Sequence, residues 1–455
     1  MDVERRNQAI HLHNEAIQAA ATDKQLAYRL FGSAVDVDGN FFDGWKQVGR
    51  ANGEMNLLHG AIAAFRRALE LNPNDVQGLV DMGHRMYHLG DMRGARKATE
   101  RAIEIEPENA YAIINLSLIE SVDGNLKKAL SLAKRAFEID RDPVIETGLA
   151  FAYLFAGDFE NGLRHFEARF PYKLPQFLSY PYPQWRGEDI AGKTLFIQAE
   201  QGLGDTLRFL RFLPLAAERA AHIVFCVQPE LVRLLRGMLA VGWPNVEIIA
   251  MPSPFPVADF WSTPHSLPVA LGLSNDEIIS RHAIPVPEWP VPAPWKAPDR
   301  KLHIGIAWQG AMGNDIDRHR SVKIERFLEL YRVPGIQLYS LQVGKDQTDI
   351  LHAMGLATLT KDLSPYIRDV ADTVAIIRDL DLVITVESSV GHMAALVEKE
   401  CWVVYGWNGG DFQLSRHRKR PVWYDNSMIF RQGPDCDWGP VFDRVVDALK
   451  QRMAT

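Results

Sequence analysis

The residues best suited to chemistry lie in short segments that combine glycine with polar side chains. The first is AEQGLGDTLRFLRF, residues 199–212, which follows a predicted strand. Glycines at such a turn let a ligand approach the backbone. Asp205 can equally be an ordinary helix N-cap, and the segment lacks the GxGxxG spacing of a dinucleotide-binding turn. The candidate ligand-binding residues of this segment are Glu200, Gln201, Gly202, Gly204 and Asp205.

The second segment, ESSVGHMAAL at residues 387–396, also follows a predicted strand. Its first residues should lie at a helix N-terminus, where free N–H groups and the helix dipole attract phosphate. Small side chains leave room for a ligand and two hydroxyls add donors. The alternative is a plain capping segment. The candidates here are Glu387, Ser388, Ser389, Gly391 and His392.

A third segment, HIGIAWQGAMGNDIDRHRS at residues 303–321, leads from a predicted strand into a glycine-rich, charged loop. Loops at the carboxyl ends of parallel strands bind ligands in α/β proteins, and arginine or lysine there can neutralise a diphosphate. An ordinary charged surface loop is the alternative, and we interpret the basic run at residues 416–420 as solvated surface. The candidates of the third segment are Trp308, Asn314, Asp315, Arg318, Arg320 and Lys323.

Composition narrows the class of protein. The chain has 455 residues, of which 47% are hydrophobic and 24% charged, with a net charge of −7. This balance excludes a disordered chain and argues against nucleic-acid partners or an anionic membrane surface. Three cysteines without metal-binding spacing predict neither a disulfide framework nor a zinc site. The charged start of the chain and the lack of a long apolar stretch predict a cytoplasmic protein without membrane insertion.

Small residues recur with a period of 34 in the first third of the chain. Two alanine series carry the period: Ala27, Ala61, Ala95 and Ala129, and Ala34, Ala68, Ala102 and Ala136. The same register aligns Gly49 with Gly83 and Pro73 with Pro107. The pattern resembles the tetratricopeptide repeat, in which paired helices pack through small residues; a helical bundle with chance periodicity is the alternative. We predict three regular repeats between residues 42 and 143, with a looser unit on each side.

Two proline-rich stretches, at residues 171–183 and 285–298, interrupt the rest of the chain. The first is predicted to end the solenoid, because consecutive prolines deny the chain helix and strand hydrogen bonds. Beyond it, short β-branched runs alternate with helical runs, which is typical of parallel α/β sheets. Strands are predicted at 194–199, 223–227, 302–308, 337–342, 380–386 and 402–405, and a closing helix at 441–453. The predicted organisation is a solenoid at 1–170, a linker at 171–190, and two Rossmann-like halves at 191–290 and 291–455.

Several longer motifs follow one another in a fixed order behind the repeats. They are PQWRGEDIAGKTLFIQAEQGLGDTLRFLRF, GIAWQGAMGNDIDRHRS, SLQVG, ADTVAIIRDLDLVITVESSVGHMAAL and VWYDNSMIFRQ. Together they resemble the bacterial repeat-containing glycosyltransferases, whose catalytic part is similar to the ADP-heptose:lipopolysaccharide heptosyltransferases. The resemblance implies a GT-B fold, in which the first half binds the acceptor and the second the nucleotide-sugar. It also implies inversion at the anomeric carbon with no cofactor and no obligatory metal.

The resemblance assigns roles to individual residues. Asp205 corresponds to the general base, Arg320 to the basic residue after the glycine-rich loop, and Lys323 to its alternate. The helix that holds the donor diphosphate corresponds to Ser388, Ser389, Gly391 and His392. Two departures occur: Glu387-Ser388 stands where relatives usually have Asp-Thr, and residues 399–401 replace a usual proline.

The predicted function is therefore transfer of a sugar from a nucleotide-sugar to an acceptor hydroxyl. A solenoid offers a groove for an extended peptide, so serine or threonine of a polypeptide is the predicted acceptor. The repeats could equally form a homodimer or dock a chaperone. Two alternatives remain: a transferase acting on a glycolipid or cell-envelope saccharide, and a non-catalytic scaffold with a degenerate transferase region.

Overall fold

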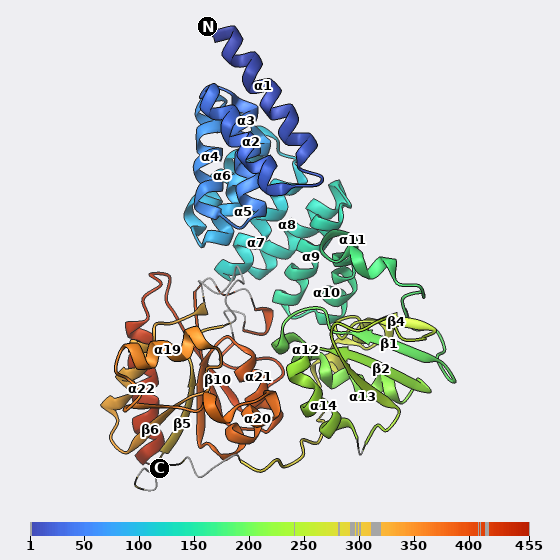
Figure 1. Cartoon of the computed structure of the whole chain (residues 1–455), viewed down its shortest axis with the longest axis vertical. Coiled ribbons are helices and arrows are strands. Elements are labelled where there is room, and N and C mark those ends of the chain that lie inside the picture. Colours follow the sequence, from blue (N-terminus) through green and yellow to red (C-terminus); the bar gives the residue numbers. More distant parts are fainter. Residues whose placement is uncertain are drawn as a thin grey trace. The chain divides into compact units, whose positions relative to one another are not determined.

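The computed structural model describes residues 2–240, 242–280, 283–291, 296, 299, 302–310, 320–407, 409, 411–414 and 418–454. The chain forms two compact units, Met1–Ala156 and Gly157–Thr455, and each is described by itself. The first is all helical and the second contains two β-sheets (Figure 1).

Consecutive helices of the first unit pack as pairs, α1 with α2, α3 with α4, α5 with α6 and α7 with α8, and α9 packs on α8. Their bounds are α1 Asp2–Ala19, α2 Lys24–Val37, α3 Phe42–Glu54, α4 Leu58–Leu71, α5 Val76–Leu89, α6 Met92–Ile105, α7 Ala110–Asp123, α8 Leu126–Ile139 and α9 Pro143–Ala156.

The 34-residue period sets both the packing and the ends of these helices. The two alanine series lie at the helix contacts, each alanine 0–3% exposed, so the helix backbones can approach closely. Gly90 and Gly124, one period apart, end α5 and α7 in the left-handed conformation with φ of 87° and 83°. Glycine adopts this conformation without steric cost. Each of these two repeats therefore stops its first helix at an equivalent position.

The second unit contains two sheets whose strands all run parallel. The first has the order β3-β2-β1-β4 and the second β10-β9-β8-β5-β6-β7. The strands are β1 Thr194–Gln198, β2 His222–Val227, β3 Val246–Ala250, β4 Phe260–Ser262, β5 Leu302–Ala307, β6 Ile336–Ser340, β7 Thr360–Asp362, β8 Leu382–Val386, β9 Cys401–Tyr405 and β10 Ser427–Arg431. The predicted parallel α/β region is confirmed.

Helices flank both sheets (Figure 1). The described helices of this unit are α10 Phe159–Phe166, α11 Arg169–Lys173, α12 Leu203–Phe209, α13 Leu213–Ala217, α14 Val232–Leu239, α15 Leu267–Ala270, α16 Asn275–Ile279, α18 Ile324–Leu328, α19 Lys345–Ala353, α20 Val370–Asp379, α21 Ser389–Leu396 and α22 Gly439–Ala454. The closing helix packs on the second sheet, where Phe442 meets Phe327 at 5.1 Å between ring centres. Strands β6, β8 and β9 are buried along their whole length, which explains their continuous apolar runs.

The first proline-rich stretch differs from the prediction, because it contains helical turns. Pro171 is the third residue of α11, and Pro175 begins a 3-10 helix, Pro175–Ser179. The first turn of a helix needs no backbone donor, so proline fits there. Phe177 of this stretch and Phe170 just before it pack against Trp261 of β4 in the first sheet. The stretch is thus part of the second unit's core.

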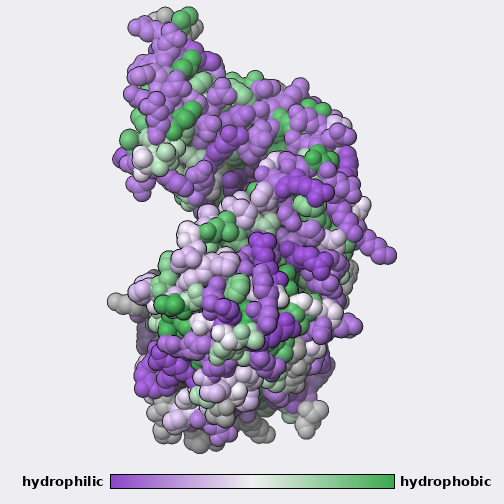
Figure 2. Space-filling view, turned by 90° about the vertical axis from the view of Figure 1, so that its right-hand side faces the viewer, coloured by the Kyte–Doolittle hydropathy of each residue, from purple (hydrophilic) through white to green (hydrophobic). Residues whose placement is uncertain are grey.

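The three cysteines form no disulfides, and the surface shown in Figure 2 is mostly hydrophilic. Cys226 and Cys401 are buried within β2 and β9, while Cys436 is exposed, and none forms a disulfide. On the face shown in Figure 2, hydrophilic residues predominate and hydrophobic ones form small separate groups. Within the described residues, no helix is both long and apolar enough to span a bilayer.

We expect Gly49→Ala to destabilise the solenoid. A Cβ at Gly49 would lie 2.8 Å from the ring of Phe65, which is 0% exposed and has no room to move. Overpacking of this kind costs about 1–3 kcal/mol. Gly32→Ala is the matched control, because nothing lies within 4 Å of its Cβ and alanine favours a helix by up to about 1 kcal/mol. Urea unfolding of the full chain, followed by circular dichroism, measures both; equal stability of the two variants would contradict the packing.

Candidate functional site

Asp205 lies at the carboxyl end of the first sheet, where α/β proteins bind ligands. Strand β1 ends at Gln198 and helix α12 begins at Leu203, so Gly202 is the N-cap residue and Asp205 falls in the first turn. The alternative reading of Asp205 as the N-cap is therefore wrong. Gln201 is exposed, and its carbonyl accepts a hydrogen bond of 2.7 Å from Gln228.

Arg208 connects Asp205 to the second sheet. Its Nη2 donates to Oδ1 of Asp205 at 2.5 Å, and its Nη1 donates to Oδ2 of Asp411, beyond β9, at 3.2 Å. Burial works to raise the pKa of Asp205, but the neighbouring Arg208 and His265 outweigh it and lower this pKa. Asp205 is a quarter exposed, with 26% of its side chain accessible. It is therefore an ionised carboxylate that solvent or a ligand can reach.

The glycine before Asp205 permits a close contact with the second candidate segment. Helix α12 packs on α21, and a Cβ at Gly204 would lie 2.9 Å from Cδ2 of His392. Nδ1 of His392 lies 2.7 Å from the hydroxyl of Tyr424. Burial and the charge of Arg208 lower the pKa of His392 to about 3, so this ring is neutral at ordinary pH. The structure therefore brings the segments at 199–212 and 387–396 together.

Glu387 and Asp411 form a carboxyl pair close to Arg208. Burial and the like charge of Asp411 raise the pKa of Glu387 to about 8, against the opposing effect of Arg320 and Arg208. Burial also raises the pKa of Asp411. Both acids line a cavity of about 30 Å³, together with Ser388, Gly391, His392 and Tyr424. That volume has room for a water molecule but not for a nucleotide.

The hydroxyl of Ser388 in the second segment has structural partners. Ser388 is the N-cap of α21, and its Oγ accepts from the N–H of Val390 at 3.3 Å and lies 2.9 Å from the hydroxyl of Thr385. Ser389 is the first residue of the helix and Gly391 the third. Ser388 is thus a capping residue, as the alternative interpretation holds. The other N–H groups in the first turn of α21 point out of the N-terminus of the helix.

The described candidate residues of the third segment do not lie together in one site. Arg320 packs against Gly310, where a side chain would collide with its guanidinium, and its charge acts on Glu387. Trp308 is 2% exposed in the core of the second sheet. Lys323 is exposed as the N-cap residue of α18 and lines a different cavity, of about 570 Å³. Asn314, Asp315, Arg318, Arg416 and His417 lie outside the described residues.

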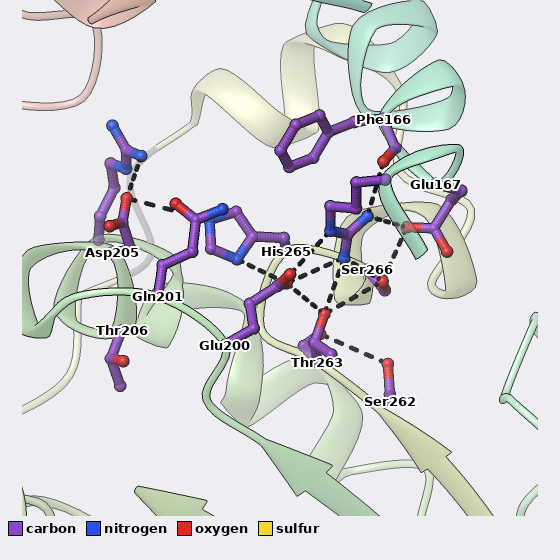
Figure 3. Close-up of polar contacts among 12 residues, drawn as sticks. Phe166, Glu167, Glu200, Gln201, Asp205, Thr206, Ser262, Thr263, His265 and Ser266 are labelled. Carbon is purple, nitrogen blue, oxygen red and sulfur yellow. Dashed lines mark hydrogen bonds and ion pairs between the residues drawn. The ribbon is translucent and has the colours of Figure 1, made fainter. Parts of the chain in front are cut away.

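Glu200 anchors a buried network beside Asp205 (Figure 3). Its side chain is fully buried, and Arg169 donates to both carboxylate oxygens, at 2.8 and 2.9 Å. Nδ1 of His265 lies 2.8 Å from Oε1 of the same carboxylate. Burial works to raise the pKa of Glu200, but His265 and Arg169 outweigh it and hold this pKa well below its usual value.

The far side of His265 faces Asp205. Nε2 of His265 lies 4.0 Å from Oδ1 of Asp205, and the imidazole packs on Phe209 with 4.1 Å between ring centres. Figure 3 shows the imidazole between Asp205 and Glu200. Arg169 also donates to the hydroxyls of Thr263 and Ser266 at 3.0 and 2.9 Å. The loop after β4 is therefore fixed to the loop after β1.

Comparisons with known proteins identify the helical unit. Residues 44–75 match the tetratricopeptide repeat family. The repeat prediction is thus confirmed, and the first unit is a tetratricopeptide-repeat solenoid.

Among curated proteins, protein FlbA of Caulobacter vibrioides is 24% identical over 337 residues. The match covers 69% of this chain and 56% of that protein, so the chain spans just over half the length of this relative.

Solved structures of repeat proteins resemble part of the chain. A thermophilic repeat protein of Thermus thermophilus is 18% identical with a TM-score of 0.34, over 37% of this chain and 95% of that one. MamA of Desulfovibrio magneticus RS-1 is 19% identical with a TM-score of 0.32, over 38% and 98%. YrrB, a repeat protein with an unusual peptide-binding site, is 17% identical with a TM-score of 0.29, over 37% and 89%.

Sequence reasoning missed several residues of this region. Arg208 stands three residues after Asp205 on the same helix, and that spacing alone predicts a contact. Arg169, His265 and Asp411 had no such signal, because they meet their partners only in the folded chain. In the described part of the chain, no group of three or more His, Cys, Asp and Glu residues is arranged to hold a metal ion.

We expect Glu387→Gln to gain stability over the parent protein as pH rises. The pKa of this carboxyl is 4.5 without neighbours and about 8 in the folded protein. Between these values the unfolded chain releases a proton that the folded protein retains, so the parent loses stability as pH rises through this window. The glutamine variant lacks this loss.

Thermal melting at pH 5, 7 and 9 measures the difference between variant and parent. That difference should grow with pH, whereas Glu325→Gln, at an exposed site of the same half, should show none. A constant difference for Glu387→Gln would contradict the raised pKa.

Proposed function

We propose that the protein is an inverting glycosyltransferase that moves a sugar from a nucleotide-sugar to an acceptor hydroxyl. The observation that carries the proposal is the contact between Gly204 and His392. It joins the carboxyl end of one parallel sheet, with Asp205, to the helix N-terminus at the carboxyl end of the other. The resemblance to heptosyltransferase-like enzymes assigns an acceptor base to the first place and the donor diphosphate to the second. The two sheets would then be the halves of a GT-B fold.

In the proposed reaction, the acceptor oxygen attacks the anomeric carbon while Asp205 takes the hydroxyl proton. The bond from this carbon to the diphosphate breaks, and the electron pair leaves with the phosphate oxygen. Negative charge therefore grows on the diphosphate. In this proposal the N-terminus of α21 and the guanidinium of Arg320, whose charge acts on the neighbouring Glu387, stabilise that charge, an effect worth several kcal/mol in a preorganised site.

Glu387 fits this chemistry despite its departure from the usual aspartate. With a pKa of about 8 it carries a proton at neutral pH. A protonated carboxyl can donate a hydrogen bond to a phosphate oxygen, whereas an ionised one would repel it. His392 is neutral at the same pH and adds no charge.

Binding of the donor requires the site to open. The cavity beside Glu387 holds about 30 Å³, and Arg208, which pairs with Asp205, also contacts Asp411 in the cavity lining. We infer that a nucleotide-sugar separates α12 from α21 as it enters. Arg208 would then exchange Asp411 for a phosphate oxygen, which a guanidinium binds well.

The acceptor in this proposal is a serine or threonine of a polypeptide. The support is the repeat solenoid, because stacked repeats form extended surfaces that suit a peptide. Solenoids also form homodimers and scaffolds. The proposal of a polypeptide acceptor is therefore based on the presence of a repeat solenoid and a proposed transferase region in one chain.

A panel of nucleotide-sugars tests the proposal. The full chain should hydrolyse or transfer from at least one of the UDP-, GDP-, ADP-, CMP- or dTDP-sugars, with label appearing on polypeptide. Label on glycolipid alone would favour the envelope acceptor. If none of the nucleotides binds, the transferase proposal is overturned and a scaffold is indicated.

We expect Asp205→Ala and the isosteric Asp205→Asn to abolish transfer and leave nucleotide binding nearly unchanged. Loss of a general base costs about 10²–10⁴ in rate, whereas the diphosphate is held elsewhere. Transfer of labelled sugar and calorimetric binding of the nucleoside diphosphate are the two measurements. Asp276→Asn, at an exposed position in α16, is the control, and parental rates in both Asp205 variants would remove it from the mechanism.

Arg320→Ala should weaken nucleoside diphosphate binding by about 10–100-fold, because a charge-assisted hydrogen bond is worth about 1.5–3 kcal/mol. Calorimetry gives the dissociation constant directly. Arg332→Ala removes a half-exposed arginine that pairs with Asp443 in the same half and should bind as the parent does. An unchanged dissociation constant for Arg320→Ala would exclude this residue from the diphosphate site.

A further inference from the structure

The glutamate, histidine and aspartate beside the acceptor site lie in a line. Glu200 contacts Nδ1 of His265 at 2.8 Å, and Nε2 of the same ring lies 4.0 Å from Oδ1 of Asp205. The side chain of His265 is 5% exposed and that of Glu200 fully buried. Figure 3 shows the imidazole between the two carboxylates.

Glu200 sets the tautomer of His265. A lone pair on Nδ1 would face the negative charge of Glu200 at 2.8 Å, so the ionised carboxylate favours the tautomer with the proton on Nδ1. In the neutral ring the other nitrogen, Nε2, then has a lone pair. Glu200 stays ionised because Arg169 donates to both of its oxygens. The lone pair of Nε2 therefore faces Asp205.

The gap between the ring and Asp205 suits a transient contact. At 4.0 Å, Nε2 and Oδ1 are too far apart for a direct hydrogen bond. One hydroxyl oxygen, or a small shift of the partly exposed Asp205, can bridge them. Phe166 and Phe209 pack around the imidazole, with ring centres 6.0 and 4.1 Å away, and restrict its motion.

Asp205 alone is poorly suited to keep a proton. Arg208 holds its pKa below the usual value, and imidazole binds a proton more tightly than a carboxylate does. The ionisable groups that face His265 are Glu200 after β1 and Asp205 on α12. Arg169 on α11 lies behind Glu200.

The geometry points to a proton relay in which His265 acts through Asp205, positioned by Glu200. This assignment rests on the proposed glycosyl transfer. The O–H bond of the acceptor breaks as its oxygen bonds to the anomeric carbon, and the diphosphate leaves with the electron pair. The proton passes to Asp205 and then to Nε2 of His265, which becomes an imidazolium between two carboxylates. It returns to solvent after the products leave.

His265→Gln tests the relay through kcat and KM. We expect kcat for transfer to fall by about 10²-fold or more, with KM for the nucleotide-sugar changed by less than about threefold, because the ring acts on the transferred proton and does not touch the donor. His222→Gln, at a half-exposed histidine of the same sheet, should match the parent.

A parental kcat in His265→Gln would overturn the relay, as would a fall in kcat accompanied by an equally large rise in KM, since that pattern indicates a structural role. Nitrogen NMR of histidine-labelled protein gives an independent readout, with the His265 signal assigned by its absence in the variant. The relay requires the proton on Nδ1 in the neutral ring. A proton on Nε2 would overturn the relay and leave the transferase proposal standing, whereas a parent protein inactive with every donor would overturn both.

Discussion

The geometry of the candidate site depends on one buried guanidinium, that of Arg169. A charge in the interior is stable only when its donors are all satisfied, and this one is met by two carboxylates and two hydroxyls. Without it the buried Glu200 would hold an uncompensated charge, a defect that costs about 3–5 kcal/mol in proteins. Arg169 lies in α11, just before the prolines. The helix before the first sheet of the second unit is thus part of the site.

A second constraint is the balance of charge around Arg208. Three carboxyls surround this guanidinium: Asp205 and Asp411, which it contacts, and Glu387, whose pKa its charge affects. At Glu387, burial and the like charge of Asp411 outweigh Arg320 and Arg208, so Glu387 retains its proton, whereas Arg208 keeps Asp205 ionised. Two acids of similar type therefore differ in protonation because their surroundings differ, as acid and base groups in active sites commonly do.

The sequence predicted those parts of the structure that depend on local pattern. The 34-residue period indicated the repeats, because each repeat packs small residues at the same positions. Strands β1, β2, β5, β6, β8 and β9 were predicted within about two residues at each end, since their apolar runs are buried on both faces. The bounds of the closing helix were also predicted within about two residues.

The parts that depend on distant contacts were missed. Strand β4 has three residues and β7 three, too few for a periodic signal, and β3 and β10 lie at sheet edges. His265 meets Glu200 across more than sixty positions of chain, and its segment contains no glycine turn or charge pattern. Its contact with Glu200 forms only when β4 pairs with β1.

The placement of the three cysteines has a practical consequence. Burial raises the pKa of Cys226 to about 11 and that of Cys401 to about 12, so both remain thiols, which are poor nucleophiles. Cys436 is the exposed cysteine of the three, in the segment before α22. A maleimide dye will therefore react at one defined position of the native chain. Single-site fluorescent labelling of the second half needs no engineered residue.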